Sequence, residues 1–409
     1  MRVVSAFSPV SGYNVRMSFH LSPELEQALT QTPWSLPRSM LPRLPRSSGF
    51  VPFRRSNGQV GVMLIDPEMD PPARVVSHDL AAMDHAYLMR QLADALAYRR
   101  ALAEEKRLDL GPAAAYRLVN ETGDGLPGLA IDIYAGFALL HLYSAHWHAW
   151  IPEITAFLLE SGLVTGLYLT ERKRGHGLQT GQFVAGRPSE EHRVIVLEHD
   201  LKYIIHLAEG PATGLYLDQR ENRHQLSLLA AEGSLLNTFS YTCSFSVAAA
   251  RHGASTLNID LSKASLHRGR ENIALNALAP EHHRFLADDV FSVLPRLQRR
   301  GERFQSILLD PPTFARVKKK TFSTERDYAE LVALAAPLLA DGGHLIAFAN
   351  THRMSEKDWT AQVYQGLGTR RDQFRAVQRP GQAPDFRFQK DDPSGHYLKG
   401  LILKAENIG

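Results

Sequence analysis

A regular alternation of strand-like and helix-like segments in the second half of the chain most constrains the fold. From residue 234 onward, the short apolar segments SLLNTF, STLNID, HRFL, FQSILLD and GGHLIAFAN alternate with helix-like segments at 244–252, 263–278, 290–300 and 327–339. Such alternation predicts a mainly parallel sheet with helices on both faces. The last segment, HYLKGLILKA, is expected to add an antiparallel edge strand. The predicted fold class is therefore α/β, with a Rossmann-like C-terminal domain.

The length of 409 residues suits two or three domains. We predict a small β-rich or degenerate PUA-like domain at 1–75, an α+β domain at 76–200 and the Rossmann-like domain at 201–409. The first segment is rich in Pro, Ser and Arg with short β-like runs, and apolar residues at helical spacing predict a linking helix at 80–105. The strand-like segments YRLVN, LAIDIY and FALLHLY, with the turn ETGDGLPG after the first, indicate hairpins in the middle domain.

Composition excludes several classes of protein. Hydrophobic residues make up 44% of the chain and charged residues 22%, as in globular proteins with a sizeable core. A single cysteine excludes an internal disulfide and a cysteine-rich zinc site, and the eighteen histidines are scattered, so no metal is predicted. No apolar run is long enough to span a membrane and no signal segment is evident, which favours a cytoplasmic location. The net charge of +3 is compatible with a nucleic acid partner.

The first strand–helix turn of the predicted sheet bears on the cofactor. It runs from Phe239 through Ser240, Tyr241 and Cys243 and contains no glycine. Dinucleotide-binding turns use glycines to bring backbone N–H groups close to a pyrophosphate. S-adenosylmethionine has no phosphate and tolerates a bulkier turn. The sequence therefore favours S-adenosylmethionine over NAD or FAD.

Acidic residues follow three successive strands of the predicted sheet. Asp260 stands 21 residues after Phe239, near the spacing of a carboxylate that accepts hydrogen bonds from both ribose hydroxyls. Asp288 and Asp289 follow the third strand, where a carboxylate can accept the adenine amino group, and Asp310 follows the fourth. Each of these carboxylates could instead cap a helix, and for Asp260 alone that alternative is serious. Three such carboxylates after three successive strands favour a ligand-binding edge of the sheet over helix capping.

Several motifs in one order resemble the bacterial large-subunit rRNA methyltransferases with a class I S-adenosylmethionine fold. They are TGLYLDQRENR (213–223), NTFSYTCSFSVAAARHGA (237–254), DDVF (288–291), DPPTF (310–314) and YLKG (397–400), joined by YRLVNETGDGLPGLAIDIY (116–134) and ERKRG (171–175) in the middle domain. The resemblance runs from about residue 80 to the end. It departs at Cys243, where the family typically has Gly, and in the first 75 residues, which show little of the PUA-type RNA-binding module.

The resemblance implies a cofactor pocket with Asp218 and Arg220 on a segment that folds over the methionine end. The full predicted cofactor-binding set is Asp218, Arg220, Phe239, Ser240, Tyr241, Cys243, Asp260, Ser262, Asp288, Asp289, Val290 and Asp310. It also implies that an extruded RNA base stacks on Phe314 beside the rigid Asp310–Pro311–Pro312 turn. Phosphates beside the base would contact Arg316, Lys318, Lys319 and Lys320. Phe314 could instead fill the core, and the lysines could form a solvated face.

The substrate implied is 23S rRNA, or a large-subunit precursor, and we allow for a homodimer. Enzymes that make 5-methylcytosine attack the ring with a cysteine thiolate. In the cytosine-modifying branch of this family that cysteine follows the fifth strand, where this chain has Ala349 and Asn350. The predicted catalytic set is Asp310, Pro311, Pro312, Phe314 and Asn350, acting on a guanine ring nitrogen such as N7. Three alternatives stay open: a small-metabolite methyltransferase, a 5-methylcytosine enzyme, and a non-catalytic RNA-binding protein.

Overall fold

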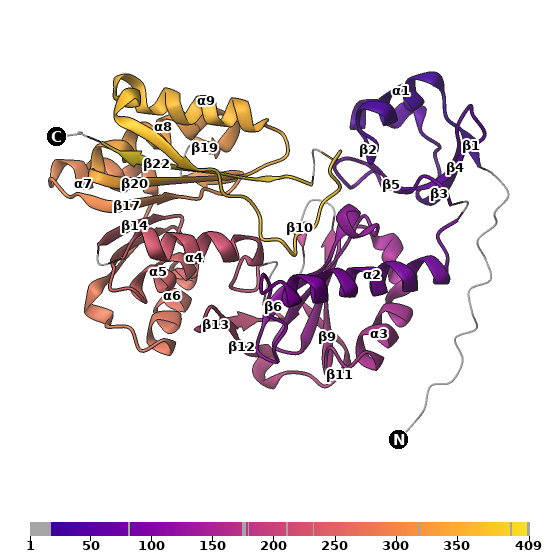
Figure 1. Cartoon of the computed structure of the whole chain (residues 1–409), viewed down its shortest axis with the longest axis horizontal. Helices are drawn as coiled ribbons and strands as arrows, with labels where there is room; N and C mark the ends of the chain where they lie inside the picture. The colour runs from indigo at the N-terminus through magenta and orange to yellow at the C-terminus, as the bar shows by residue number, and fades with distance from the viewer. Residues whose placement is uncertain are drawn as a thin grey trace.

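The chain folds around three large β-sheets, each in a separate unit of the computed structural model (Figure 1). The structure describes residues 18–80, 82–173, 177–178, 180–209, 212–231, 233–317, 320–392 and 395–406, and of these it describes the backbone alone at 172–173, 177–178, 314–317 and 320–321. Within these residues, no helix is long and apolar enough to cross a membrane.

The N-terminal unit is a small β-rich domain, as predicted. Its sheet has the order β1-β3-β4-β5-β2. The strands are β1 (Phe19–His20), β2 (Ser35–Leu36), β3 (Gly49–Arg54), β4 (Val60–Ile65) and β5 (Ala73–Ser77). Helix α1 (Pro23–Gln31) begins after Ser22, whose Oγ accepts a hydrogen bond from the Leu25 N–H at 3.4 Å. Phe53 and Met63 are fully buried in its core. A PUA-like identity stays a prediction.

The middle unit is α+β and contains the predicted linking helix. Its sheet has the order β10-β9-β8-β7-β6, with β11 also paired to β9. The strands are β6 (Ala115–Asn120), β7 (Leu129–Tyr134), β8 (Phe137–Leu142), β9 (Gly166–Lys173), β10 (Gly177–Leu178) and β11 (Gln182–Gly186), with α2 (His85–Glu104) and α3 (Ile151–Glu160). A hairpin of β12 (Arg193–Glu198) and β13 (Leu201–His206) follows, so the predicted boundary at residue 200 falls at its turn. The boundaries stay predictions.

The C-terminal unit confirms the α/β prediction. Its seven-stranded sheet has the order β16-β15-β14-β17-β20-β22-β21, and the first five strands are parallel. The strands are β14 (Ser234–Thr238), β15 (Ser255–Asp260), β16 (His283–Ala287), β17 (Phe304–Leu309), β20 (Leu339–Asn350), β21 (Phe374–Gln378) and β22 (Leu398–Ala405). The antiparallel direction of β22 is confirmed. Its position differs from the prediction, because β21 adds outside it and leaves β22 within the sheet.

Two groups of three helices cover the two faces of this sheet (Figure 1). They are α4 (Arg220–Leu229), α5 (Ser244–Ala250) and α6 (Lys263–Leu275) on one face, and α7 (Val290–Arg299), α8 (Thr324–Ala335) and α9 (Glu356–Leu367) on the other. Strand β21 was not predicted, because all of its residues after Phe374 are exposed and the apolar pattern is weak. Helices α4 and α9 were also not predicted.

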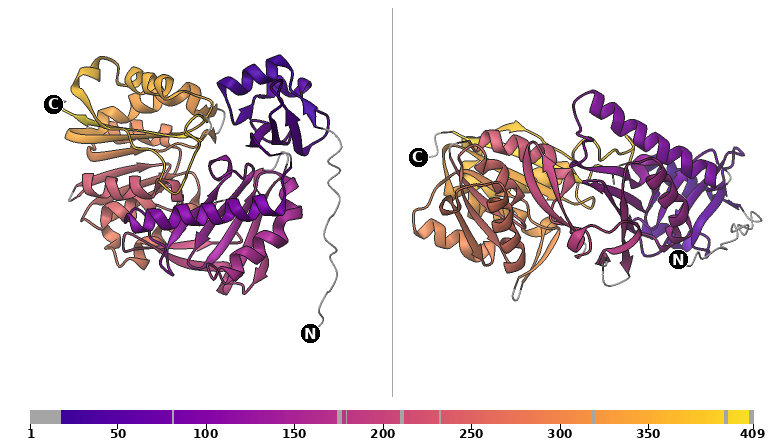
Figure 2. Two further views of the ribbon diagram at one scale, coloured as in Figure 1. Left: turned by 45° about the vertical axis from the view of Figure 1, so that its right-hand side comes forward. Right: turned by 90° about the horizontal axis from the view of Figure 1, so that it is seen from below.

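The segment 379–397 lies between β21 and β22, and its described residues, 379–392 and 395–397, run back from the C-terminal unit to the middle unit (Figures 1 and 2). The Tyr98 hydroxyl of α2 donates to the Pro384 carbonyl at 3.0 Å, and the Asn120 side chain donates to the Arg387 carbonyl at 2.8 Å. A Cβ on Gly123 would lie 1.8 Å from that Arg387 carbonyl oxygen. The glycine-rich turn 121–128 therefore lets this segment lie directly against the middle unit.

Candidate active site

The carboxyl ends of the parallel strands bring the predicted site residues to one edge of the sheet. Strand β14 lies between β15 and β17, so the strand order reverses there. Open α/β sheets bind ligands at such a switch point, outside the carboxyl ends of the strands. Phe239 follows β14, Asp260 ends β15, Asp310 follows β17 and Asn350 ends β20. The topology therefore gathers residues that lie up to 111 positions apart in the sequence.

The glycine-free turn after β14 has an unusual backbone. Phe239, Tyr241 and Cys243 have φ angles of 53°, 47° and 60°, in the left-handed region that non-glycine residues rarely adopt. Three hydrogen bonds hold this conformation: the Ser240 N–H donates to the Ile259 carbonyl at 2.9 Å, the Cys243 N–H to the Ser240 carbonyl at 2.7 Å, and the Tyr241 N–H to Asp260. The turn is thus strained and fixed by its neighbours.

Asp260 joins this turn to the start of the next helix. Its Oδ2 accepts from the Tyr241 N–H at 2.8 Å and its Oδ1 from the Ser262 N–H at 2.8 Å. The cap of α6 is Ser262, whose Oγ accepts from the Ser265 N–H, so Asp260 does not take the helix-capping role. A carboxylate has about four acceptor positions, so Asp260 could accept two further hydrogen bonds. It is half-buried at the sheet edge, where a ligand can reach it.

The two acidic residues after β16 differ in their surroundings. Asp289 is buried and caps α7, accepting from the Phe291 N–H at 3.2 Å and the Ser292 hydroxyl at 2.9 Å. Val290, the first residue of that helix, is buried behind it. Asp288 accepts from the Asp289 N–H at 2.8 Å and forms an ion pair with Arg296. The capping alternative thus describes Asp289, and Asp288 is the more accessible carboxylate.

Asp310 lies beside a second carboxylate, Asp218, on the 3₁₀ turn Leu217–Gln219. Gln219 donates to Asp310 Oδ2 at 3.2 Å, and the Tyr397 hydroxyl donates to Asp218 Oδ2 at 2.9 Å. Burial, and then the charge of Asp218, raise the pKa of Asp310 to about 7. Burial also raises the pKa of Asp218. Among the residues that the structure describes, no basic side chain is hydrogen-bonded to either carboxyl group, so this is a favourable place for a cation.

We expect the raised pKa of Asp310 to make cofactor binding depend on pH. A cationic ligand favours the ionised carboxylate, so affinity falls as pH falls through about 7, because Asp310 takes up a proton in the free protein. For S-adenosylmethionine the expected loss between pH 8 and pH 6 is about tenfold. Calorimetric titrations across this range measure it, and Asp310→Asn should bind weakly with a flat profile. A flat profile in the wild-type protein would contradict the prediction.

The Asp-Pro-Pro turn leads into a hairpin of β18 (Phe314–Val317) and β19 (Lys320–Ser323). Pro311 is buried and Pro312 exposed, and the Thr313 hydroxyl donates to the Asn350 carbonyl at 2.5 Å. This bond ties the turn to the end of β20. The side chains of Phe314, Arg316 and Lys320, and all of Lys318 and Lys319, lie outside the described part of the structure, so the base-stacking and phosphate-binding roles stay predictions.

A cavity of about 430 Å³, here called the central cleft, opens beside this edge and touches all three units. On the C-terminal side it is lined by Asp218, Tyr241, Asn350 and Tyr397. On the facing side it is lined by Asp70 and Arg74 of the N-terminal unit and by Arg117, Asp132 and His141 of the middle unit. Tyr241 belongs to both the cofactor turn and the cleft, and its ring lies 5.4 Å from that of Tyr216. The cleft therefore reaches the edge where the cofactor residues gather.

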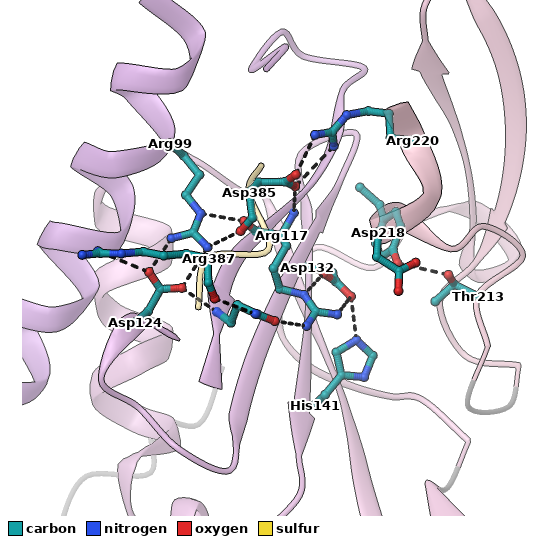
Figure 3. A network of polar contacts seen from close by, with 12 residues as sticks. Arg99, Arg117, Asp124, Asp132, His141, Thr213, Asp218, Arg220, Asp385 and Arg387 are labelled. Carbon is teal, nitrogen blue, oxygen red and sulfur yellow. Dashed lines mark hydrogen bonds and ion pairs between the residues drawn. The ribbon is translucent and has the colours of Figure 1, made fainter. Parts of the chain in front are cut away.

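The wall from the middle unit carries charged residues that the sequence analysis missed (Figure 3). Asp132 Oδ1 accepts from Arg117 Nε at 2.5 Å, Oδ2 accepts from Arg117 Nη2 at 3.2 Å, and His141 Nε2 lies 2.9 Å from Oδ2. Burial alone would raise the pKa of Asp132, but Arg117 and then His141 lower it to about 2. The signal in the sequence was a single charged residue or histidine within each of the apolar strands YRLVN, LAIDIY and FALLHLY.

Arg220 lies at a different place from the other predicted cofactor residues. Its Nη2 and Nη1 donate to the two carboxylate oxygens of Asp385 at 2.6 and 3.2 Å, and Asp385 also accepts from the Arg117 N–H at 2.8 Å (Figure 3). Arg220 therefore links α4 to the segment 379–397, and Asp385 links that segment to the middle unit through Arg117. Its proposed contact with the cofactor stays a prediction.

The residues at the sheet edge fit S-adenosylmethionine. Asp260 has acceptor capacity for ribose hydroxyls, and the Asp310–Asp218 pair suits the positively charged methionine end. The buried Ser240 Oγ has no hydrogen-bond partner among the described residues, so a polar group of a ligand can satisfy it. No cluster of potential metal ligands occurs within the described ranges.

Comparisons with known proteins agree with this chemistry. The sequence model of the S-adenosylmethionine-dependent methyltransferase family matches residues 160–389. The chain belongs to this family. Ribosomal RNA large subunit methyltransferase I of Shewanella amazonensis is 34% identical over 332 residues, which cover 79% of this chain and 82% of the relative. The enzyme of the same name from Aeromonas salmonicida is 33% identical over 341 residues, which cover 81% and 84%.

Solved structures show the same fold over nearly the whole length of this methyltransferase. SMU.776, assigned as a methyltransferase and solved in complex with S-adenosylhomocysteine (SAH), has a TM-score of 0.86 and 27% identity, and it covers 95% of this chain and 100% of its own. A Streptococcus mutans protein assigned as an S-adenosylmethionine-dependent methyltransferase has a TM-score of 0.84 and 26% identity over the same shares. The predicted enzyme class and cofactor are therefore confirmed.

Proposed function

We propose that this methyltransferase transfers a methyl group from S-adenosylmethionine to a base of large-subunit ribosomal RNA, at a guanine ring nitrogen. The names of the two relatives support ribosomal RNA as the substrate. The observation that carries the proposal is the central cleft, which adjoins the cofactor edge at Tyr241 and Asp218 and is large enough for a base. An extruded base in this cleft would lie beside the Asp310–Pro311 turn.

The position of the sole thiol supports a reaction without a cysteine nucleophile. Cys243 is fully buried in the cofactor turn, and burial raises its pKa to about 12, so it is a neutral thiol at physiological pH. A Cβ on Gly269 of α6 would lie 2.4 Å from the Cys243 Sγ, so the glycine makes room for this side chain. The end of β20, where a catalytic cysteine is expected for cytosine chemistry, carries Ala349 and Asn350.

The charge of the central cleft supports a ring nitrogen as the acceptor. Methylation of guanine N7 moves the positive charge of the sulfonium onto the base. Among the described residues that line the cleft, five carboxyl groups face three guanidinium groups: Asp70, Glu121, Asp132, Asp218 and Asp392 against Arg74, Arg117 and Arg387. Carboxylates close to the bound base would stabilise it as it becomes cationic. A ring nitrogen has its own lone pair and requires only alignment with the methyl group.

Each part of the site then has a task. When bound, S-adenosylmethionine supplies a methyl group already activated by its sulfonium. Asp260 would hold the ribose, and the Asp218–Asp310 pair would hold the methionine end beside the cleft. The Thr313–Asn350 hydrogen bond fixes the Asp-Pro-Pro turn, which would grip the base through its backbone carbonyls. Alignment in this way can lower the barrier by up to about 7–11 kcal/mol.

The test is transfer of a labelled methyl group to large-subunit RNA from cells that lack the gene. We expect labelling of this RNA, little labelling of RNA from cells with the gene, and none with Asp310→Ala. Transfer to low-molecular-weight material alone would favour the small-metabolite alternative. Cofactor binding without any transfer would favour the non-catalytic one. A cytoplasmic location and a homodimer stay predictions.

Replacement of Cys243 by Ser should leave catalysis intact and reduce stability. The hydroxyl would be buried in a space shaped for sulfur, at a cost of about 1–3 kcal/mol in the free energy of unfolding. Urea denaturation measures the loss, and methyl transfer at a temperature below the transition should stay within about twofold of the wild type. Loss of methyl transfer in a folded variant, or a covalent adduct between Cys243 and 5-fluorocytosine RNA, would contradict this.

A further inference from the structure

Arg117 of β6 faces the cofactor edge from across the central cleft (Figure 3). Its guanidinium is held in one orientation on three sides. Asp132 of β7 accepts from Nε and Nη2, and the Asn120 side chain accepts from Nη1 at 2.9 Å. The ring of Phe386 packs against the guanidinium at 4.5 Å. Asp385, beside that ring, accepts from the backbone N–H of Arg117. These contacts come from two units of the chain.

A second layer of contacts holds the partner of Arg117. His141 of β8 lies 2.9 Å from Asp132 Oδ2 and 2.8 Å from the Thr170 hydroxyl of β9. Cross-strand register places these groups side by side, because Arg117 pairs with Asp132 and His141 pairs with Thr170. A buried ion pair contributes little net stability compared with apolar side chains. An arrangement that orients one guanidinium at a cleft therefore indicates a ligand.

The hydrogen bonds of Arg117 leave donors for that ligand. A guanidinium has five N–H groups. Three of them donate to Asp132 and Asn120, so one N–H on each terminal nitrogen has no protein partner among the described residues. The side chain is 13% exposed and lines the cleft. The group it binds must therefore be a hydrogen-bond acceptor.

The surroundings determine the charge of this acceptor. The charge of Arg117 is already balanced by Asp132, and carboxyl groups outnumber guanidinium groups around the cleft. The cleft therefore offers no excess positive charge for a phosphate, whereas a neutral carbonyl oxygen needs none. Arginine bound to guanine O6 is a common pairing, and adenine has a donor at the corresponding position. We propose that Arg117 is a specificity-determining residue that donates to a carbonyl oxygen of the target base, O6 if that base is guanine.

This inference rests on the proposed function and is tested with Arg117→Lys, which keeps the charge and loses the planar pair of donors. The substrate is a short RNA that contains the methylated position, with the natural base or with an analogue that lacks the carbonyl oxygen. For guanine the analogue is 2-aminopurine, which keeps N7. The analogue should lower kcat/KM of the wild-type enzyme about 10- to 100-fold. On the natural RNA, Arg117→Lys should lower kcat/KM by a similar factor. The variant should no longer discriminate between the two RNAs, and its Kd for S-adenosylmethionine should be unchanged.

The matched control is Arg223→Lys. Arg223 forms another buried pair with two hydrogen bonds, to Glu198 at 2.7 and 2.6 Å, and it does not line the central cleft. The control should lose comparable thermal stability and keep the discrimination. The inference is overturned if Arg117→Lys still discriminates between the two RNAs, if Arg223→Lys loses discrimination equally, or if the methylated base is adenine. A wild-type enzyme that transfers nothing to RNA would instead refute the proposed function.

Discussion

Replacing Asp260 by Ala should lower the affinity for S-adenosylmethionine about 100- to 10,000-fold. Two hydrogen bonds from the ribose hydroxyls to the carboxylate would be lost, each contributing about 1.5–3 kcal/mol. The substitution also removes the acceptor for the Tyr241 and Ser262 N–H groups. The strained turn at Phe239–Cys243 would then lose one of the contacts that fix its left-handed residues.

Calorimetry measures this affinity, and a thermal melt shows whether the variant is folded. Asp260→Asn serves as the graded control, because its amide keeps one acceptor oxygen and loses the charge. We expect its Kd to lie between those of the wild type and Asp260→Ala. Unchanged affinity in a folded Asp260→Ala protein would show that Asp260 does not bind the ribose hydroxyls.

Asp385→Ala should destabilise the protein by about 3–5 kcal/mol. The Asp385 side chain is fully buried. It accepts hydrogen bonds from Nη1 and Nη2 of Arg220 and from the backbone N–H of Arg117. Its loss would leave the Arg220 guanidinium buried without this partner. Because Asp385 also joins the C-terminal segment 379–397 to the middle unit, we expect the central cleft to loosen and methyl transfer to fall with stability.

Urea denaturation followed by tryptophan fluorescence measures the change in the free energy of unfolding. Asp391→Ala is the matched control, because it removes an exposed carboxylate from the same segment. It should change stability by less than about 0.5 kcal/mol. A loss below about 1 kcal/mol for Asp385→Ala would mean that Arg220 finds water or another acceptor and that this contact does not hold the units together.

The sheet edge could be predicted from the sequence because its signals are local. The apolar segment Phe304–Leu309 ends at an acidic residue and two prolines, and the structure has a strand with those bounds. Once the strands were predicted to be parallel, Asp260, Asp289 and Asp310 had to lie at one edge. The capping of α7 by Asp289 could not be separated from ligand binding in advance, because both place a carboxylate just after a strand.

The facing wall of the cleft could not be predicted, because it depends on contacts between distant parts of the chain. Arg117, Asp132 and His141 lie on strands recognised as hairpins, but nothing in their spacing shows that the C-terminal unit faces them. Phe386 and Asp385 reach Arg117 from 268 or more positions away. The position of β22 inside the sheet was missed for a similar reason, since β21 has few apolar residues to mark it as a strand.

The identity of the methylated nucleoside tests the central claim most directly. Large-subunit RNA from cells without the gene is treated with the purified enzyme and S-adenosylmethionine, digested, and analysed by mass spectrometry. Both the wild type and Cys243→Ser should yield 7-methylguanosine, because the cleft is acidic and the sole thiol is buried in the cofactor turn. A product of 5-methylcytidine would contradict the account.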